Sequence, residues 1–98
     1  MKFKDILDSD RRLAILRLLT DVNGQANDSV IHKALDALGH ANQPRNQIRK
    51  DLQFLENNGL ANIEWLEDVM IVSITERGDD AAHGRVDVVG VSRPRIGR

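Results

Sequence analysis

Residues 43–75 read QPRNQIRKDLQFLENNGLANIEWLEDVMIVSIT. In the first half of this stretch apolar side chains recur at i, i+4 and i+7, as Ile48, Leu52 and Leu55. This spacing places them on one side of a helix, facing a core, and leaves polar side chains on the other side. Pro44 suits the first turn, because its missing N–H costs no hydrogen bond there. The stretch therefore begins with an amphipathic surface helix.

The second half of the stretch changes from helical spacing to strand spacing. Asn58-Gly59 ends the helix. Residues 60–66 and 69–74 are then short apolar runs joined by a tight turn at Glu67-Asp68, which is typical of two antiparallel strands. The whole stretch predicts a helix followed by a β-hairpin.

Two helices are expected before this stretch and a short one after it. The first spans residues 3–21, where apolar side chains recur at helical spacing. The second begins at residues 27–28, where Asn and Asp are good capping residues, and Gly39 ends it. Thr75 is expected to cap the last helix. The expected core comprises Leu13, Leu16, Leu35, Ile48, Leu52, Leu55 and Ile74.

The chain of 98 residues is long enough for one modest core. We expect a domain over residues 1–84 and a basic C-terminal segment over residues 85–98, in which residues 85–91 are suited to one more strand. The chain has no cysteine, which excludes disulfides, thiolate metal sites and cysteine nucleophiles. No segment resembles a signal peptide or approaches the ~18 apolar residues of a membrane span, so the expected location is the cytoplasm.

The net charge of −1 hides an uneven distribution along the chain. Residues 59–80 hold six acidic side chains and one basic side chain. Residues 81–98 hold four basic side chains and one acidic side chain. Only local charge can therefore attract phosphate groups.

Three local patterns, in this order, resemble winged helix-turn-helix transcriptional regulators of the ArsR, MarR and PadR type. DSDRRLAILRLL (8–19) is similar to their first helix, IRKDLQFLENNGLA (48–61) to their recognition helix, and ITERGDDAAHG (74–84) to their strand-to-helix junction. VVGVSRP (88–94) is similar to small proteins of Mu-like prophages. The resemblance implies a mainly α fold with a small antiparallel hairpin: a three-helix core, a two-stranded wing and a short fourth helix.

A recognition helix implies sequence-specific binding of double-stranded DNA in transcriptional regulation. Basic side chains bond phosphate or guanine, and amide side chains bond adenine. The candidate contacts are Arg45, Asn46, Arg49, Lys50 and Gln53. A homodimer is expected, because one domain with so little positive charge would bind weakly alone. Arg93 and Arg95 are candidate tail contacts, and the alternative for the tail is a loose, solubilising end.

Two features of the predicted wing leave another function open. Glu67 and Asp68 at its turn oppose binding to phosphate. The wing is also unusually apolar, because it carries Trp65, Leu66, Val69 and Ile71. Either half of these side chains complete the core, or they form a surface for a partner. The alternative function is a winged-helix protein-interaction module that does not bind DNA.

The chain contains no sequence motif that is typical of an enzyme or of a metal-binding protein. There is no H-E-x-x-H, G-x-S-x-G, P-loop or G-x-G-x-x-G motif. His32, His40 and His83 are scattered along the chain. We therefore expect neither catalysis, nor a cofactor, nor a bound metal.

Overall fold

The computed structural model describes residues 2–94, in which four helices accompany a three-stranded antiparallel sheet. The helices are α1 (Phe3–Asp21), α2 (Asp28–Ala37), α3 (Arg45–Asn57) and α4 (Glu76–Ala82). The strands are β1 (Gln25–Asn27), β2 (Ala61–Leu66) and β3 (Val69–Ile74). The fold is mixed α/β, and its β2–β3 hairpin is compatible with a wing.

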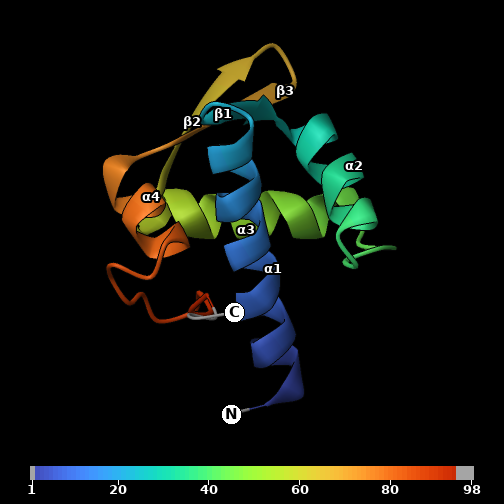
Figure 1. Ribbon diagram of the computed structural model, residues 1–98. Coiled ribbons are helices and arrows are strands. Elements are labelled where there is room, and N and C mark those ends of the chain that lie inside the picture. The colour runs from blue at the N-terminus through green and yellow to red at the C-terminus, as the bar shows by residue number, and fades with distance from the viewer. Residues whose placement is uncertain (1, 95–98) are drawn as a thin grey trace.

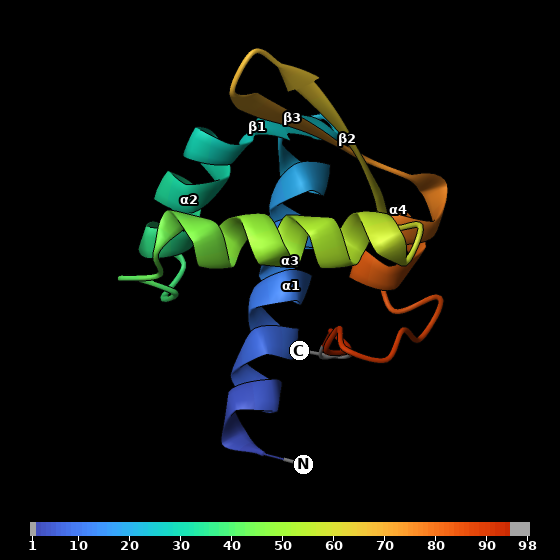
Figure 2. The ribbon, with the colours of Figure 1, turned by 180° about the vertical axis from the view of Figure 1, so that it is seen from behind.

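Helix α1 is the axis of the molecule, and α3 crosses it (Figures 1 and 2). The sheet lies at the C-terminal end of α1, while the N-terminal end of α1 projects away from the other elements. Helices α2, α3 and α4 all contact α1. In Figure 2 the long α3 lies across the front of the molecule, so one of its sides is turned away from α1.

The helix positions expected from periodicity and capping residues are confirmed. The side chain of Asn27 caps α2 by accepting a hydrogen bond of 2.8 Å from the backbone N–H of Val30. The hydroxyl of Thr75 caps α4 in the same way, accepting from the N–H of Gly78 at 3.0 Å. Each cap satisfies an N–H that has no partner within its helix, which fixes where the helix begins.

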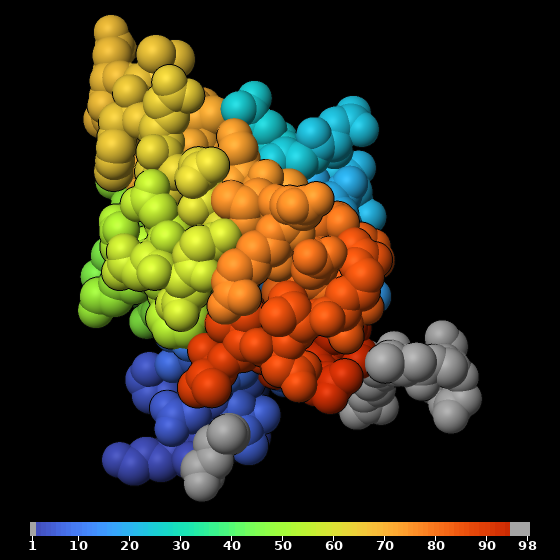
Figure 3. Space-filling model, turned by 90° about the vertical axis from the view of Figure 1, so that its left-hand side faces the viewer, coloured from blue at the N-terminus to red at the C-terminus, as the bar shows by residue number. Residues whose placement is uncertain are grey.

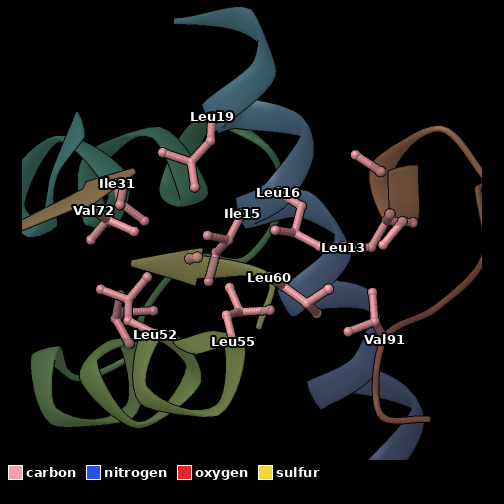
Figure 4. Close-up of a cluster of buried hydrophobic side chains, with 14 of the residues drawn as sticks. Leu13, Ile15, Leu16, Leu19, Ile31, Leu52, Leu55, Leu60, Val72 and Val91 are labelled. Atoms are coloured by element: carbon pink, nitrogen blue, oxygen red, sulfur yellow. The ribbon is translucent and has the colours of Figure 1, made fainter. Parts of the chain in front are cut away.

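The core lies between the four helices and the sheet, and Figure 4 shows its side chains converging from these elements. Six of the seven expected core residues are buried, and Ile74 is partly buried against them. Leu60, Met70 and Val72 bring the hairpin into the same cluster. Burial of these side chains holds α3 between α1 and the hairpin.

The sheet corrects the expectation of a two-stranded hairpin. Strand β1 pairs with β3, with Ala26 opposite Val72, and the strand order is β1-β3-β2. Strand β1 is not predictable from the sequence, because it has only three residues, two of them polar, and shows no apolar alternation. It is a strand only because β3 supplies its hydrogen-bonding partners.

The expectation of a strand at residues 85–91 is wrong, since this segment has an irregular backbone. Gly90 has a φ of +94°, and the N–H of Val91 bonds back to the carbonyl of Val88 at 3.1 Å, so the chain turns instead of extending. Val88 and Val91 are buried, while Val89 is exposed. The valines therefore anchor a turn to the core.

None of the helices within residues 2–94 combines the length and the apolar character needed to cross a membrane.

Candidate functional site

The outward side of α3 carries a row of polar side chains. Asn46, Lys50, Gln53 and Asn57 follow one another at i, i+4, i+7 and i+11, and all four are exposed. Arg45 is exposed at the start of the helix. We call these five residues the polar face of α3. It runs along the side of the helix that is turned away from the core, as the helical spacing predicts.

The inward side of α3 contains a buried charge as well as its apolar side chains. Asp51 has no exposed surface and pairs with Arg11, which is also buried, with Nη2 and Oδ1 3.1 Å apart and a second contact between Nε and Oδ2. Arg12 adds a contact of 3.3 Å from its Nε to Asp51. This ion pair fixes α3 to α1.

The pKa values of two groups in this network are shifted. Burial opposes the charge of Arg11, but its hydrogen bonds to Asp51 and Asp8 outweigh burial and raise the pKa of the guanidinium. The hydrogen bond from Lys4 lowers the pKa of the Asp8 carboxyl despite some burial, and Arg11 lowers it further. Asp51 is not among the residues that the sequence predicts for the core or for a functional site. Its spacing of three residues from Ile48 and four from Leu55 already places it on the apolar side of α3.

Arg49, a predicted DNA contact, is already bound within the protein. Its guanidinium pairs with the buried Asp28 at the start of α2, with Nε and Nη2 lying 3.0 and 2.8 Å from Oδ2. Nη2 also donates to the carbonyl of Asp68 at 3.2 Å, and the guanidinium lies 5.2 Å from the ring centroid of Trp65. Arg49 therefore joins α2, α3 and the hairpin. That it also contacts DNA stays a prediction.

The other predicted contacts are brought together on the polar face of α3. Arg45 donates a hydrogen bond to the hydroxyl of Ser29. Gln53 donates to Glu56 at 3.1 Å and to Asn57 at 3.2 Å, both on its own helix. The side chains of Asn46 and Lys50 form no hydrogen bond or ion pair within residues 2–94, so both are available to a ligand.

The end of the β2–β3 hairpin is both apolar and acidic. We call residues 64–69 the hairpin tip. Trp65 is 53% exposed, Leu66 67% and Val69 38%, so these side chains form surface rather than core. The three exposed carboxylates of the tip form no ion pair with any other described residue; they are Glu64, Glu67 and Asp68.

Arg93 and the histidines do not join this face. Arg93 pairs with Asp87 at 3.0 Å on the surface, and Arg95 lies outside the described residues. A ring nitrogen of His32 lies 2.7 Å from the carbonyl of Gln43, at the turn before α3. Over residues 2–94, no group of three or more histidine, aspartate or glutamate side chains is placed to hold a metal ion.

Comparison with known proteins gives the family of this chain. It is 46% identical over 91 residues to gp26 of Escherichia phage Mu, an uncharacterized protein, and the match covers 93% of this chain and 94% of gp26. It is also 42% identical over 78 residues to an uncharacterized protein of Haemophilus influenzae, covering 79% of this chain and 76% of that protein. The chain therefore belongs to the same family as Mu gp26, a family of small phage-related proteins.

This relationship confirms the phage-related part of the resemblance seen in residues 88–94. No protein-family model matches the chain, and no solved structure gives a significant match.

Proposed function

We propose that this protein is a winged helix-turn-helix regulator that binds double-stranded DNA through the polar face of α3. The arrangement of α1, α2 and α3 with a hairpin beside α3 supports this proposal. The single observation that carries it is the exposed row of Asn46, Lys50, Gln53 and Asn57, which extends along nearly the whole of α3. Amides and a central lysine are the groups that bond base edges and phosphates.

The dimensions of α3 suit the major groove. Its 13 residues make a helix roughly 20 Å long, and a helix about 10–12 Å wide enters a groove about 12 Å wide. The Arg11–Asp51 pair and the Arg49–Asp28 pair hold α3 in place from two sides. A helix that is already rigid loses little entropy on binding, which favours affinity.

A homodimer is part of this proposal. The net charge of −1 gives one copy little attraction for DNA, and two copies reading two half-sites offset that weakness. The projecting end of α1 exposes Phe3, Ile6 and Leu7, which form an apolar patch suited to contact with a second copy. Sedimentation at micromolar concentration tests the dimer, and a strict monomer contradicts it.

The duplex proposal is tested by selecting bound fragments of genomic DNA with the purified protein and then measuring affinity for the selected duplex at several salt concentrations. Lys50→Ala is the informative variant, because Lys50 is exposed and its side chain forms no hydrogen bond or ion pair with the residues that the structure describes. The loss should be ~1–3 kcal/mol if Lys50 reads a base. If it contacts phosphate only, the loss is similar on every sequence, and the salt slope falls by about one.

Lys33→Ala is the matched control, since Lys33 is an exposed lysine on α2 outside the polar face. Its affinity for the duplex should equal that of the unaltered protein. Equal losses in the two variants would show that the polar face is not the contact surface. Absence of duplex binding by the unaltered protein even at low salt would overturn the whole proposal.

The exposed Trp65 and Leu66 favour a second candidate function, a winged-helix protein-interaction module that does not bind DNA. The same salt series separates the two. A DNA-binding protein loses affinity for the duplex steeply as the salt concentration rises. An interaction module does not bind the duplex at any salt concentration.

A further inference from the structure

The hairpin tip stands out from the body of the molecule, where its side chains have few neighbours. Figure 3 shows the hairpin, in yellow and light orange, projecting beyond the rest of the surface. Leu66 and Val69 lie opposite each other on one face of the hairpin, and Trp65 lies on the other face. All three are exposed, and large exposed apolar side chains at one end of a hairpin are the usual mark of a contact surface. Tryptophan is also among the residues that contribute most at protein interfaces.

The tip is held in a defined position. Arg49 donates to the carbonyl of Asp68 and lies against the ring of Trp65, while its other hydrogen bonds go to the buried Asp28. The hairpin is therefore fastened to α2 and α3 close to its turn. A surface that is fixed before binding associates at a lower entropic cost than a flexible one.

The charges of the tip limit what binds it. Its three carboxylates, Glu64, Glu67 and Asp68, have no cationic partner among the described residues. They repel phosphate, so neither DNA nor an anionic membrane surface matches the tip. The complementary surface is apolar and bears positive charge at its rim.

The chain itself carries such a surface between α1 and α2. A hollow of about 520 Å³ is lined by Ala14, Leu18, Ala34, Ala37 and Leu38. A second hollow of about 430 Å³ shares Ala34 and Ala37 and extends it past Val30. We call this continuous surface the α1–α2 groove. Both hollows are open to solvent, and each has room for an apolar side chain such as Leu66 or Val69.

The rim of the α1–α2 groove has the opposite charge to the tip. Arg17 and Lys33 are exposed at its edges, and neither is in an ion pair within residues 2–94. Asp21 lines one end, so the lining carries one net positive charge against three negative charges at the tip. None of the lining residues lies on α3.

We propose that the hairpin tip of one copy docks in the α1–α2 groove of a second copy. The two surfaces differ, so the contact is head-to-tail and each copy retains one free tip or groove for the next. The apolar contact is small and belongs to the weak, transient class, in which charge complementarity mainly sets specificity. This contact is separate from the proposed DNA contact and from the apolar end of α1.

The test uses the one tryptophan of the chain, Trp65, as a local reporter. One copy is ¹⁵N-labelled Arg17→Glu/Lys33→Glu, which has an intact tip but a groove of reversed charge. It is titrated with unlabelled Leu66→Ala/Val69→Ala, which has an intact groove but a truncated tip. All four positions are at the surface, so both variants are expected to fold. The indole N–H signal of Trp65 should shift and saturate as the unlabelled protein is added.

A matched titration replaces the unlabelled partner by unlabelled Arg17→Glu/Lys33→Glu, which offers no competent groove. The Trp65 signal should then stay in place. An equal shift with either partner, or no shift with the groove-bearing partner, overturns the proposal. A dimer formed through α1 contributes equally to both titrations, so it does not affect this comparison.

Reversing both charge sets gives the second measurement. Glu67→Lys/Asp68→Lys should bind the unaltered groove about tenfold more weakly and regain affinity for the Arg17→Glu/Lys33→Glu groove. Failure of this exchange to restore binding overturns the charge-matched contact. Undiminished docking of Glu67→Lys/Asp68→Lys in the unaltered groove also overturns it, because the charges of the tip would then play no part in the contact. Neither result bears on whether Lys50 contacts DNA.

Discussion

At the scale of single residues, Gly78 decides how closely α4 approaches the hairpin. A Cβ atom at this position would lie 2.0 Å from the carbonyl oxygen of Leu60 and 2.8 Å from a side-chain carbon of Ile74. The same Leu60 carbonyl accepts a hydrogen bond of 3.1 Å from the N–H of Thr75, the capping residue of α4. The absence of a side chain at Gly78 is therefore what lets α4 begin directly against the start of β2.

Gly78→Ala gives two opposing effects of known sign. In a helix, alanine is favoured over glycine by about 1 kcal/mol, so helix propensity alone predicts a more stable protein. Crowding against Leu60 should outweigh this preference and lower the free energy of unfolding by ~1–3 kcal/mol. Urea unfolding followed by circular dichroism measures the difference. Glu76→Ala, an exposed position on the same helix, should change it by no more than about 0.5 kcal/mol. A stabilised Gly78→Ala protein would contradict the close packing of α4.

Only the part of the candidate site that depends on helical geometry was predictable from the sequence. The angle of 100° per residue sufficed to place Asn46, Lys50 and Gln53 on the outward side of α3. The engagement of Arg49 was not predictable, because its partner Asp28 lies 21 positions away and meets it only after α2 and α3 have packed. Ion pairs between distant segments depend on tertiary contacts, and the spacing of residues within one helix does not predict such contacts.

At the scale of elements, the helices were predictable and the full sheet was not, for one physical reason. A helix forms its hydrogen bonds within itself, so α1 and α3 are visible as local periodicity. A strand forms them with another strand, so β1 exists only through β3. The opposite error was made at residues 85–91, where a strand was predicted and none forms. Their valines suit a strand by composition, but the positive φ of Gly90 turns the chain toward α1, where Arg12 donates to the Gly90 carbonyl at 3.0 Å.

The attachment of α3 to α1 through Arg11 and Asp51 predicts an asymmetry between single and double variants. Asp51→Asn leaves the buried Arg11 without its main counter-charge and should cost ~3–5 kcal/mol of unfolding free energy. Arg11→Met/Asp51→Leu removes both charges and should cost less than the single change, since apolar packing replaces a desolvated pair. Urea unfolding of the three proteins checks this order. If the double variant loses at least as much unfolding free energy as Asp51→Asn, removal of the partner charge gives no relief and the two residues do not act as a pair.

At the scale of the whole molecule, charge is separated between two surfaces of a nearly neutral chain. The polar face of α3 carries Arg45 and Lys50, while the hairpin tip carries three carboxylates. Because exposed charges act over about 8–10 Å in physiological salt, the acidic tip weakens the attraction between phosphate and nearby parts of the protein. In the proposed DNA complex the affinity would therefore come from α3, and the hairpin tip would remain free for the docking proposed above.

This separation predicts opposite effects of one variant on the two proposed contacts. In Glu67→Ala/Asp68→Ala, duplex affinity should stay unchanged or rise, because repulsion of phosphate is relieved. Docking of the same variant in the α1–α2 groove should weaken, because attraction to Arg17 and Lys33 is lost. Fluorescence anisotropy with the selected duplex measures the first effect, and the Trp65 indole signal measures the second. Loss of duplex binding in this variant, together with intact duplex binding in Lys50→Ala, would show that the hairpin tip rather than α3 contacts DNA.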